Sequence, residues 1–129
     1  MRSATVEIDD LFLRRWSPRA MSGEAITREE LMPLCEAARW APSAMNNQPW
    51  RFVYALRDTP SWAPFFDLLV ERNQRWCRQA GALVVLISRD TFAPTGAPAR
   101  THSFDTGAAW MSLALQGTLA GLVVHGMQG

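Results

Sequence analysis

The sequence has no lysine, only two cysteines and no long apolar run, and the last two features each exclude a class of protein. Thirteen arginines face twelve acidic residues, for a net charge of +1, so composition gives no argument for binding nucleic acid or an anionic membrane. Cys35 and Cys77 lack the paired spacing of a zinc site. The longest apolar run, residues 82–87, is far too short to cross a bilayer.

The remaining composition is typical of a soluble globular protein. It is 48% hydrophobic and 19% charged, and 129 residues are enough for one domain with a real core. The N-terminal sequence MRSATVEIDD has no apolar stretch of the kind found in secretory signals. We therefore expect a cytoplasmic protein with two free thiols and with neither membrane nor nucleic acid as a partner.

One candidate site is a loop dense in polar side chains at residues 41–52, APSAMNNQPWRF. Proline disfavours the α conformation in the residue before it, so Pro42 should end the preceding helix. Pro49 restricts φ just before residues 50–54, whose aromatic and β-branched side chains suit a strand. The hydroxyl and amide groups between the prolines could bind a flat polar ligand, or could satisfy their own backbone in a simple connector. The residues alone leave both interpretations open.

A second candidate site lies in residues 14–19, Arg-Arg-Trp-Ser-Pro-Arg, which place three guanidinium groups and a hydroxyl within six positions. Arginine can bind phosphate oxygens through two parallel hydrogen bonds and serine can donate another, so the segment is typical of a phosphate-binding site. The alternative is a solvated basic turn, because this pattern has little specificity by itself.

Apolar spacing and cap residues predict the first three helices. The first ends near Arg15, and the second opens with a capping box made by Thr27 and Glu30. Pro33 either kinks this second helix or lies close to its start. A third helix is predicted over residues 61–78.

The last predicted helix begins with Ser103 or Asp105 as its N-cap. One of its faces carries unusually small side chains, at Ala114, Gly117 and Gly121. Small side chains let a neighbouring helix approach closely, so this face could pack in the core or at a subunit interface.

Strands are predicted at residues 50–56 and 82–88, with a third beginning at Leu122. The continuous apolar run of the second strand predicts burial on both faces. We therefore expect an α/β protein, more closely an α+β sandwich, with a central sheet flanked by helices in a single domain over residues 1–129.

The stretch at residues 41–52 resembles the signature loop of the FMN-dependent nitroreductase family, which reads roughly A-P-S-x-x-N-x-Q-P-W-x-F. Every fixed position is present: Ala41, Pro42, Ser43, Asn46, Gln48, Pro49, Trp50 and Phe52. Residues 15–19 are also similar to the family's N-terminal motif, roughly R-x-S-x-R/K, which contacts the phosphate and ribityl chain of FMN.

The resemblance implies a set of FMN contacts, residue by residue. Asn73 lies ten positions before Leu83, where the family has a helical asparagine that reaches the flavin; by position alone it could equally be a solvated helix residue. Gln128 and Gly129 align with an acidic residue and a glycine near the flavin's reactive nitrogen. The implied cofactor-binding residues are Arg15, Trp16, Ser17, Arg19, Pro42, Ser43, Asn46, Asn73, Gln128 and Gly129.

The implied protein is a homodimer in which Pro42, Ser43 and Asn46 reach the partner's flavin. Its implied reaction takes hydride from NADH or NADPH through FMN to a nitroaromatic, quinone or similar acceptor, and needs no catalytic side chain or metal. Family members continue for about a further third of their length, so we expect this domain to lack its C-terminal third. The alternative is a non-catalytic remnant or interaction module of the same fold that does not retain FMN.

Overall fold

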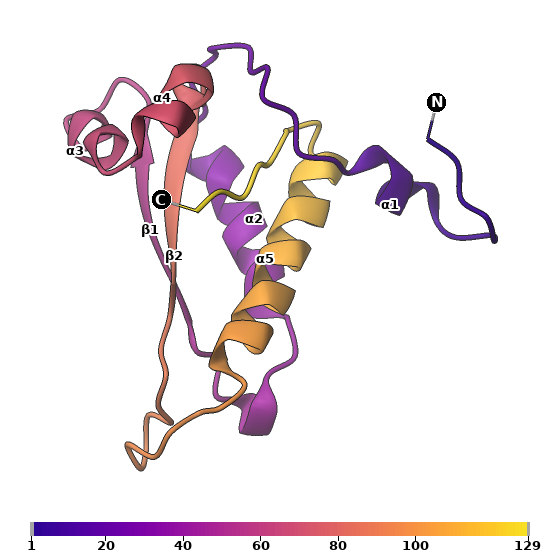
Figure 1. Ribbon diagram of the computed structural model, residues 1–129, viewed down its shortest axis with the longest axis vertical. Coiled ribbons are helices and arrows are strands. Elements are labelled where there is room, and N and C mark those ends of the chain that lie inside the picture. Colours follow the sequence, from indigo (N-terminus) through magenta and orange to yellow (C-terminus); the bar gives the residue numbers. More distant parts are fainter. Residues whose placement is uncertain (1, 129) are drawn as a thin grey trace.

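The computed structural model describes residues 2–128, and these form five α-helices, one short 3-10 helix and two strands. Along the chain they are α1 (Asp10–Arg14), α2 (Arg28–Arg39), η1 (Ala44–Asn46), β1 (Trp50–Leu56), α3 (Trp62–Asp67), α4 (Glu71–Cys77), β2 (Ala82–Ser88) and α5 (His102–Leu119). Helices α2 and α5 lie side by side against the β1–β2 ribbon, α3 and α4 lie at one end of it, and α1 extends away from the body (Figure 1).

The two predicted strands form an antiparallel pair, with Trp50 opposite Ser88 at one end and Leu56 opposite Ala82 at the other. The prediction that the second strand is buried on both faces is wrong. Side chains alternate along a strand, so Leu83, Val85 and Ile87 share one face. Leu83 packs into the cluster that includes residues of α3 and α4, but Val85 and Ile87 are 39% and 45% exposed. These two short helices therefore cover only one end of that face.

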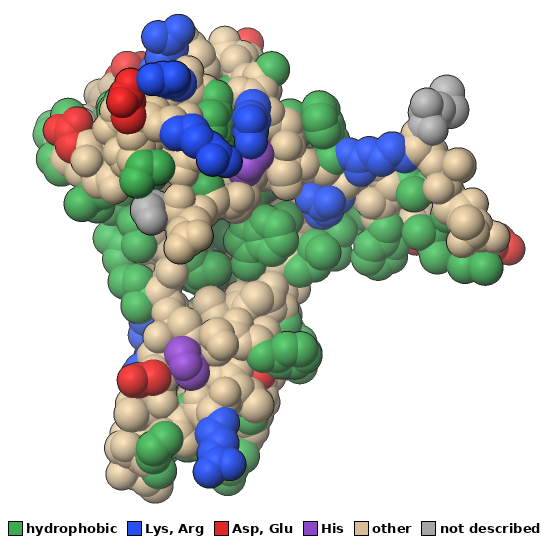
Figure 2. Space-filling model, in the orientation of Figure 1, with side chains coloured by type: hydrophobic (Ala, Val, Ile, Leu, Met, Phe, Trp, Pro, Cys, Tyr) green, Lys and Arg blue, Asp and Glu red, His purple; other side chains and the backbone are tan. Residues whose placement is uncertain are grey.

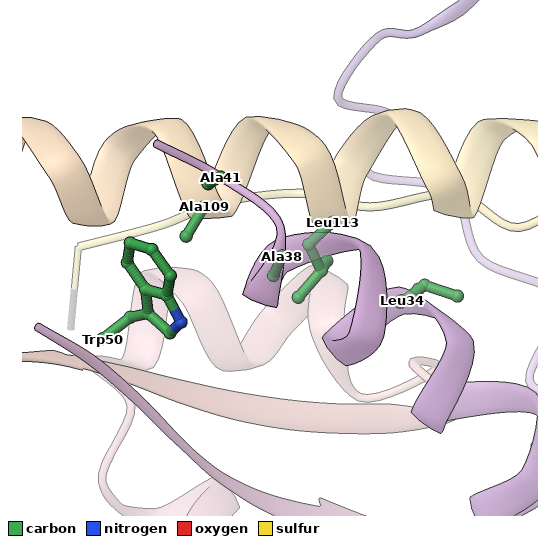
Figure 3. Packing of buried hydrophobic residues seen from close by; sticks show 6 residues of the cluster. All are labelled: Leu34, Ala38, Ala41, Trp50, Ala109 and Leu113. Atoms are coloured by element: carbon green, nitrogen blue, oxygen red, sulfur yellow. The ribbon is translucent and has the colours of Figure 1, made fainter. Parts of the chain in front are cut away.

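The main core lies between α2, α5 and the opposite face of the ribbon. Small side chains bring the two helices close together: Ala38 on α2 and Ala109 and Ala114 on α5 have no exposed surface. The indole of Trp50 extends from β1 toward Ala109, and Leu113 packs beside Ala38 (Figure 3). Part of the small-residue face of α5 is thus in the core of the chain.

Helix α2 begins as predicted. The Thr27 hydroxyl accepts a hydrogen bond from the Glu30 amide at 3.2 Å, and the Glu30 carboxylate accepts one from the Thr27 amide at 2.7 Å. The helix starts at Arg28 and contains Pro33, so the alternative in which it begins close to Pro33 is wrong. It ends at Arg39, before Pro42, as expected.

The helix predicted over residues 61–78 is wrong as a single element, because the chain leaves helical geometry between α3 and α4. Val70, between the two helices, has an extended conformation, with φ −62° and ψ 144°. The Gln74 side-chain amide donates to the carbonyl oxygens of Phe66 and Leu69, at 3.1 and 3.0 Å. These bonds tie α4 to the end of α3.

The predicted N-cap of the last helix is also wrong. Thr101 is the N-cap of α5, and both Ser103 and Asp105 lie inside the helix. Asp105 is 6% exposed, and its carboxylate accepts hydrogen bonds from the Thr101 hydroxyl at 3.0 Å and from the Ala44 amide at 3.1 Å. The carboxylate therefore joins the start of α5 to the loop before β1 instead of capping its own helix.

The strand predicted to begin at Leu122 is not formed within the described residues. Residues 122–128 instead run back from the end of α5 without regular structure (Figure 1). Leu122 and Val124 pack against the core cluster, and a Cβ on Gly126 would lie 3.0 Å from the ring of Trp110. Side-chain packing on α5, not pairing with a strand, therefore fixes this C-terminal segment (residues 122–128).

We expect Gly117→Ala to destabilise the protein. An added Cβ would lie 2.7 Å from Cγ2 of Val124, which is too close without a shift of the C-terminal segment. Overpacking of this kind costs about 1–3 kcal/mol, against about 1 kcal/mol gained from better helix propensity. Denaturant unfolding measures the resulting change in the free energy of unfolding. Gly107→Ala is the matched control on the same helix, because its Cβ meets nothing within 4 Å and the change should stabilise the protein slightly. A Gly117→Ala variant as stable as Gly107→Ala contradicts this packing.

Candidate functional site

A cleft of about 440 Å³ lies where α4, the C-terminal segment and the irregular segment before α2 meet. Arginine side chains gather at this end of the molecule beside a histidine (Figure 2). The residues that line the cleft are Arg19, Val70, Arg72, Asn73, Trp76, His125, Gly126, Met127 and Gln128. Guanidinium, amide, imidazole and backbone groups therefore surround a space large enough for a small molecule.

Asn73 lies in this cleft and is half-buried, so it is not a freely solvated residue of the helix face. Its side-chain amide donates a 2.8 Å hydrogen bond to the carbonyl oxygen of Gln128. The bond joins α4 to the C-terminal segment and brings together two residues that the sequence singled out from positions 55 apart. Gly129, the other residue singled out at this end, lies outside the described residues.

Of the four N-terminal candidates, only Arg19 lines the cleft. Ser17 is exposed, and Arg15 is half-buried with its carbonyl oxygen accepting a hydrogen bond from Arg2 at 2.9 Å. Trp16 is 55% exposed, and the Arg2 guanidinium lies 5.5 Å from the centre of its ring. These three residues therefore lie in the segment that connects α1 to the cleft, outside the cleft lining.

Pro42, Ser43 and Asn46 do not line the cleft. They lie around η1, at the foot of α5, at the opposite end of the molecule from α4 (Figure 1). The Ser43 hydroxyl accepts from the Gln48 amide at 3.0 Å, and the Asn46 side chain accepts from the Gln48 side chain at 2.8 Å. Within this chain, the loop's polar groups thus bond to one another, as a simple connector would.

The loop around η1 is nevertheless held in an uncommon shape. Met45, Asn46 and Gln48 have φ values of 52°, 52° and 47°, in the left-handed region that side chains disfavour. Asn47 helps to fix it, because its side chain accepts from Arg89 at 3.0 Å. Strained conformations persist where the surroundings impose them, and they occur often in ligand-binding loops.

Among the cleft residues that the sequence did not single out, three have charged or aromatic side chains: Arg72, Trp76 and His125. Trp76 lies three positions after Asn73 and four after Arg72, so helical spacing could have placed its side chain beside both. His125 lies three positions before Gln128. Its Nδ1 is 3.0 Å from the carbonyl oxygen of Pro18, and its ring centre is 4.3 Å from that of Trp76.

The other chemically suggestive groups are better explained as structural. Ser88 Oγ is 2.7 Å from Nδ1 of His102 and accepts from the Thr106 hydroxyl at 3.1 Å, which ties β2 to α5. Burial raises the pKa of the Cys35 and Cys77 thiols, so both stay protonated at neutral pH and are weak nucleophiles. Among residues 2–128, no group of histidine, cysteine or carboxylate side chains is arranged to hold a metal ion.

Comparison with protein families places the chain in the nitroreductase family. The family model matches residues 13–129, so the chain belongs to this family, as its signature loop predicted. Its arrangement of helices with a small antiparallel sheet is a nitroreductase-like α+β fold. Comparison with curated proteins gives no match. In the described part of the chain, no helix is both long and apolar enough to cross a membrane.

Solved structures show the same fold. One is described as an oxidoreductase containing FMN; it is 50% identical, has a TM-score of 0.94, and the match covers 99% of this chain and 66% of that chain. A Desulfovibrio desulfuricans protein described as a nitroreductase in complex with FMN is 24% identical, with a TM-score of 0.69 and coverage of 85% and 61%. An iodotyrosine deiodinase bound to FMN and 3-iodo-L-tyrosine is 23% identical, with a TM-score of 0.66 and coverage of 92% and 73%. The chain thus spans less than two thirds of the length of the first two structures.

Proposed function

We propose that this chain is the FMN-binding part of an oxidoreductase that takes hydride from NADH or NADPH and reduces a nitroaromatic, quinone or similar acceptor. The observation that carries the proposal is the cleft in which Arg19, Asn73 and Gln128 meet, although they come from three distant parts of the sequence. The 50% identical structure that contains FMN supports the same cofactor.

The residues of the cleft fit FMN in size and chemistry. Its volume of about 440 Å³ is in the range of small-molecule sites. Arg19 and Arg72 offer guanidinium groups for a phosphate, and Trp76 offers an aromatic wall. The Asn73 side-chain oxygen can accept a hydrogen bond while its amide holds Gln128 in place. The donors for an anionic end and the wall for an apolar end are thus both present.

When bound, FMN supplies the redox chemistry, because flavins accept and deliver hydride. The chain's own residues bind and orient. In this proposal Arg19 neutralises the phosphate, and Arg15, Trp16 and Ser17 extend the same segment along the phosphate and ribityl chain. Asn73 contacts the ring or ribityl chain, and Gln128 with Gly129 contacts the redox edge. No proton donor or nucleophile from the chain is required.

The proposal includes a homodimer, because Pro42, Ser43 and Asn46 lie at the wrong end of the chain to serve its own cleft. In a symmetric pair, the same three residues would complete the partner's cleft instead. Large apolar side chains are exposed near them: Met45 at 89%, Phe104 at 79% and Trp40 at 74%. Burial of such side chains favours association. We also retain the cytoplasmic assignment, to which the two free cysteines are suited.

The proposed reaction predicts that the purified protein carries a visible flavin spectrum. Adding NADH or NADPH without oxygen should bleach that spectrum, and adding a nitroaromatic or a quinone should restore it. Bound FMN that neither nucleotide reduces would contradict the proposed oxidoreductase activity. A folded protein that does not take up FMN favours the alternative, a non-catalytic interaction module of the same fold.

A further inference from the structure

We propose that His125 is a positioning residue that holds the arginine-bearing segment (residues 15–19) at the cleft and so sets the preference for FMN over riboflavin, its form without phosphate. The inference rests on the proposed function, because it concerns the same cleft. His125 lies outside the signature motifs, and its hydrogen bond to Pro18 is the contact that would hold the segment.

The chemistry of that contact fixes the state of the histidine. A carbonyl oxygen only accepts hydrogen bonds, so Nδ1 of His125 must carry the proton that it donates to Pro18 across 3.0 Å. The ring also packs on Trp76, with centres 4.3 Å apart and planes inclined by 40°. Two different contacts therefore hold the imidazole in place, one to the arginine-bearing segment and one to α4.

The arginine-bearing segment has few other attachments. It belongs to the irregular stretch between α1 and α2, which has no regular hydrogen-bonded structure to support it. In the described chain, the backbone amide of Arg15 bonds to Leu11 at the end of α1, and the next backbone bond belongs to the Gly23 amide, which donates to Gln79 at 3.1 Å. The bond from His125 joins the chain midway between these two points.

The position of this bond predicts that its loss weakens only the binding of the FMN phosphate. Pro18 is buried and directly precedes Arg19, whose side chain is exposed in the cleft. Loss of the bond should let the Arg19 guanidinium move, whereas Asn73 and Gln128 are held by their own hydrogen bond. The phosphate contact should therefore weaken while contacts to the flavin ring and ribityl chain remain.

Two substitutions separate the hydrogen bond from the packing. His125→Phe keeps a ring against Trp76 but removes the donor, and His125→Asn keeps an amide donor close to the place of Nδ1. We expect His125→Phe to bind FMN about three- to tenfold more weakly, the effect of one net hydrogen bond, and riboflavin unchanged within about twofold. His125→Asn should recover most of the loss. His102→Phe is the control, because it removes a histidine bond remote from the cleft and should leave the ratio of the two affinities unchanged.

The experiment is a fluorescence titration of each variant with FMN and with riboflavin, beside limited digestion with trypsin without flavin. A loosened segment should be cut faster after Arg15 and Arg19 in His125→Phe than in the wild type, His125→Asn or His102→Phe. Equal weakening for both flavins, unchanged FMN binding, or an asparagine variant as weak as the phenylalanine variant overturns the inference. So does faster cleavage with an unchanged affinity ratio. A wild-type protein that binds neither flavin contradicts the proposed function, and the selectivity claim falls with it, while the digestion still reports whether the His125 bond holds the segment.

Discussion

Arg19→Ala is expected to weaken FMN binding by about 1.5–3 kcal/mol, the contribution of a hydrogen bond to a charged group, or about ten- to over a hundredfold in Kd. Arg19 is the one member of the arginine-bearing segment that lines the cleft, so its guanidinium is the natural partner for a phosphate there. Riboflavin has the same ring and ribityl chain without the phosphate. Its affinity should therefore change little, and parallel fluorescence titrations measure both values.

Arg75→Ala is the matched control for this change. Arg75 lies on α4 near the cleft but outside its lining, and it forms a 2.7 Å ion pair with Glu71. Its removal lowers the local positive charge by the same amount, yet should leave FMN affinity nearly unchanged because the pair is exposed. Equal losses in the two variants would mean that FMN responds only to overall charge. If Arg19→Ala weakened the affinity for FMN and for riboflavin equally, Arg19 would not be a ligand of the phosphate.

Two variants that each bind FMN weakly are expected to regain tight binding when their subunits are mixed. In the proposed homodimer, each site takes Arg19 from one subunit and Asn46 from the other. Arg19→Ala damages the first contribution, and Asn46→Gly removes the second side chain while tolerating the positive φ of this position. A mixed dimer then has one site with both changes and one site with neither. After random exchange of subunits, about a quarter of all sites should bind FMN as in the wild type.

The measurement is the FMN bound by each variant alone and by the mixture, at concentrations where the wild type is saturated. Light scattering on the same samples gives the oligomeric state. No recovery in a mixture whose subunits demonstrably exchange would mean that the site is built within one chain. A monomer that still binds FMN tightly would contradict the placement of Pro42, Ser43 and Asn46 in the partner's site.

Local patterns in the sequence predicted local structure well. The capping box of Thr27 and Glu30 depends only on residues three positions apart, and it forms as predicted. Strands at residues 50–56 and 82–88 follow from their apolar and β-branched side chains, which suit a strand in many contexts. The signature loop identified the family because its fixed positions are close together in the sequence.

Features that depend on distant contacts were not predictable in this way. The apolar residues Leu122 and Val124 suit a strand, but they pack on the α2–α5 core instead. Asp105 is of a residue type that often caps helices, but its carboxylate accepts a hydrogen bond from the Ala44 amide, 61 positions away. The meeting of Arg19, Asn73 and His125 in one cleft likewise depends on how α4 and the C-terminal segment pack, which no local pattern contains.

Binding of FMN in this cleft is best tested by a crystal structure of the protein with FMN. We expect the phosphate within about 3 Å of the Arg19 guanidinium, which is hydrogen-bond distance, and the flavin ring beside Asn73 and Gln128. We also expect the Ser43 and Asn46 side chains of a second subunit to approach the same flavin. A flavin bound elsewhere, or a cleft that stays empty in crystals of folded protein at saturating FMN, would contradict FMN binding at this site.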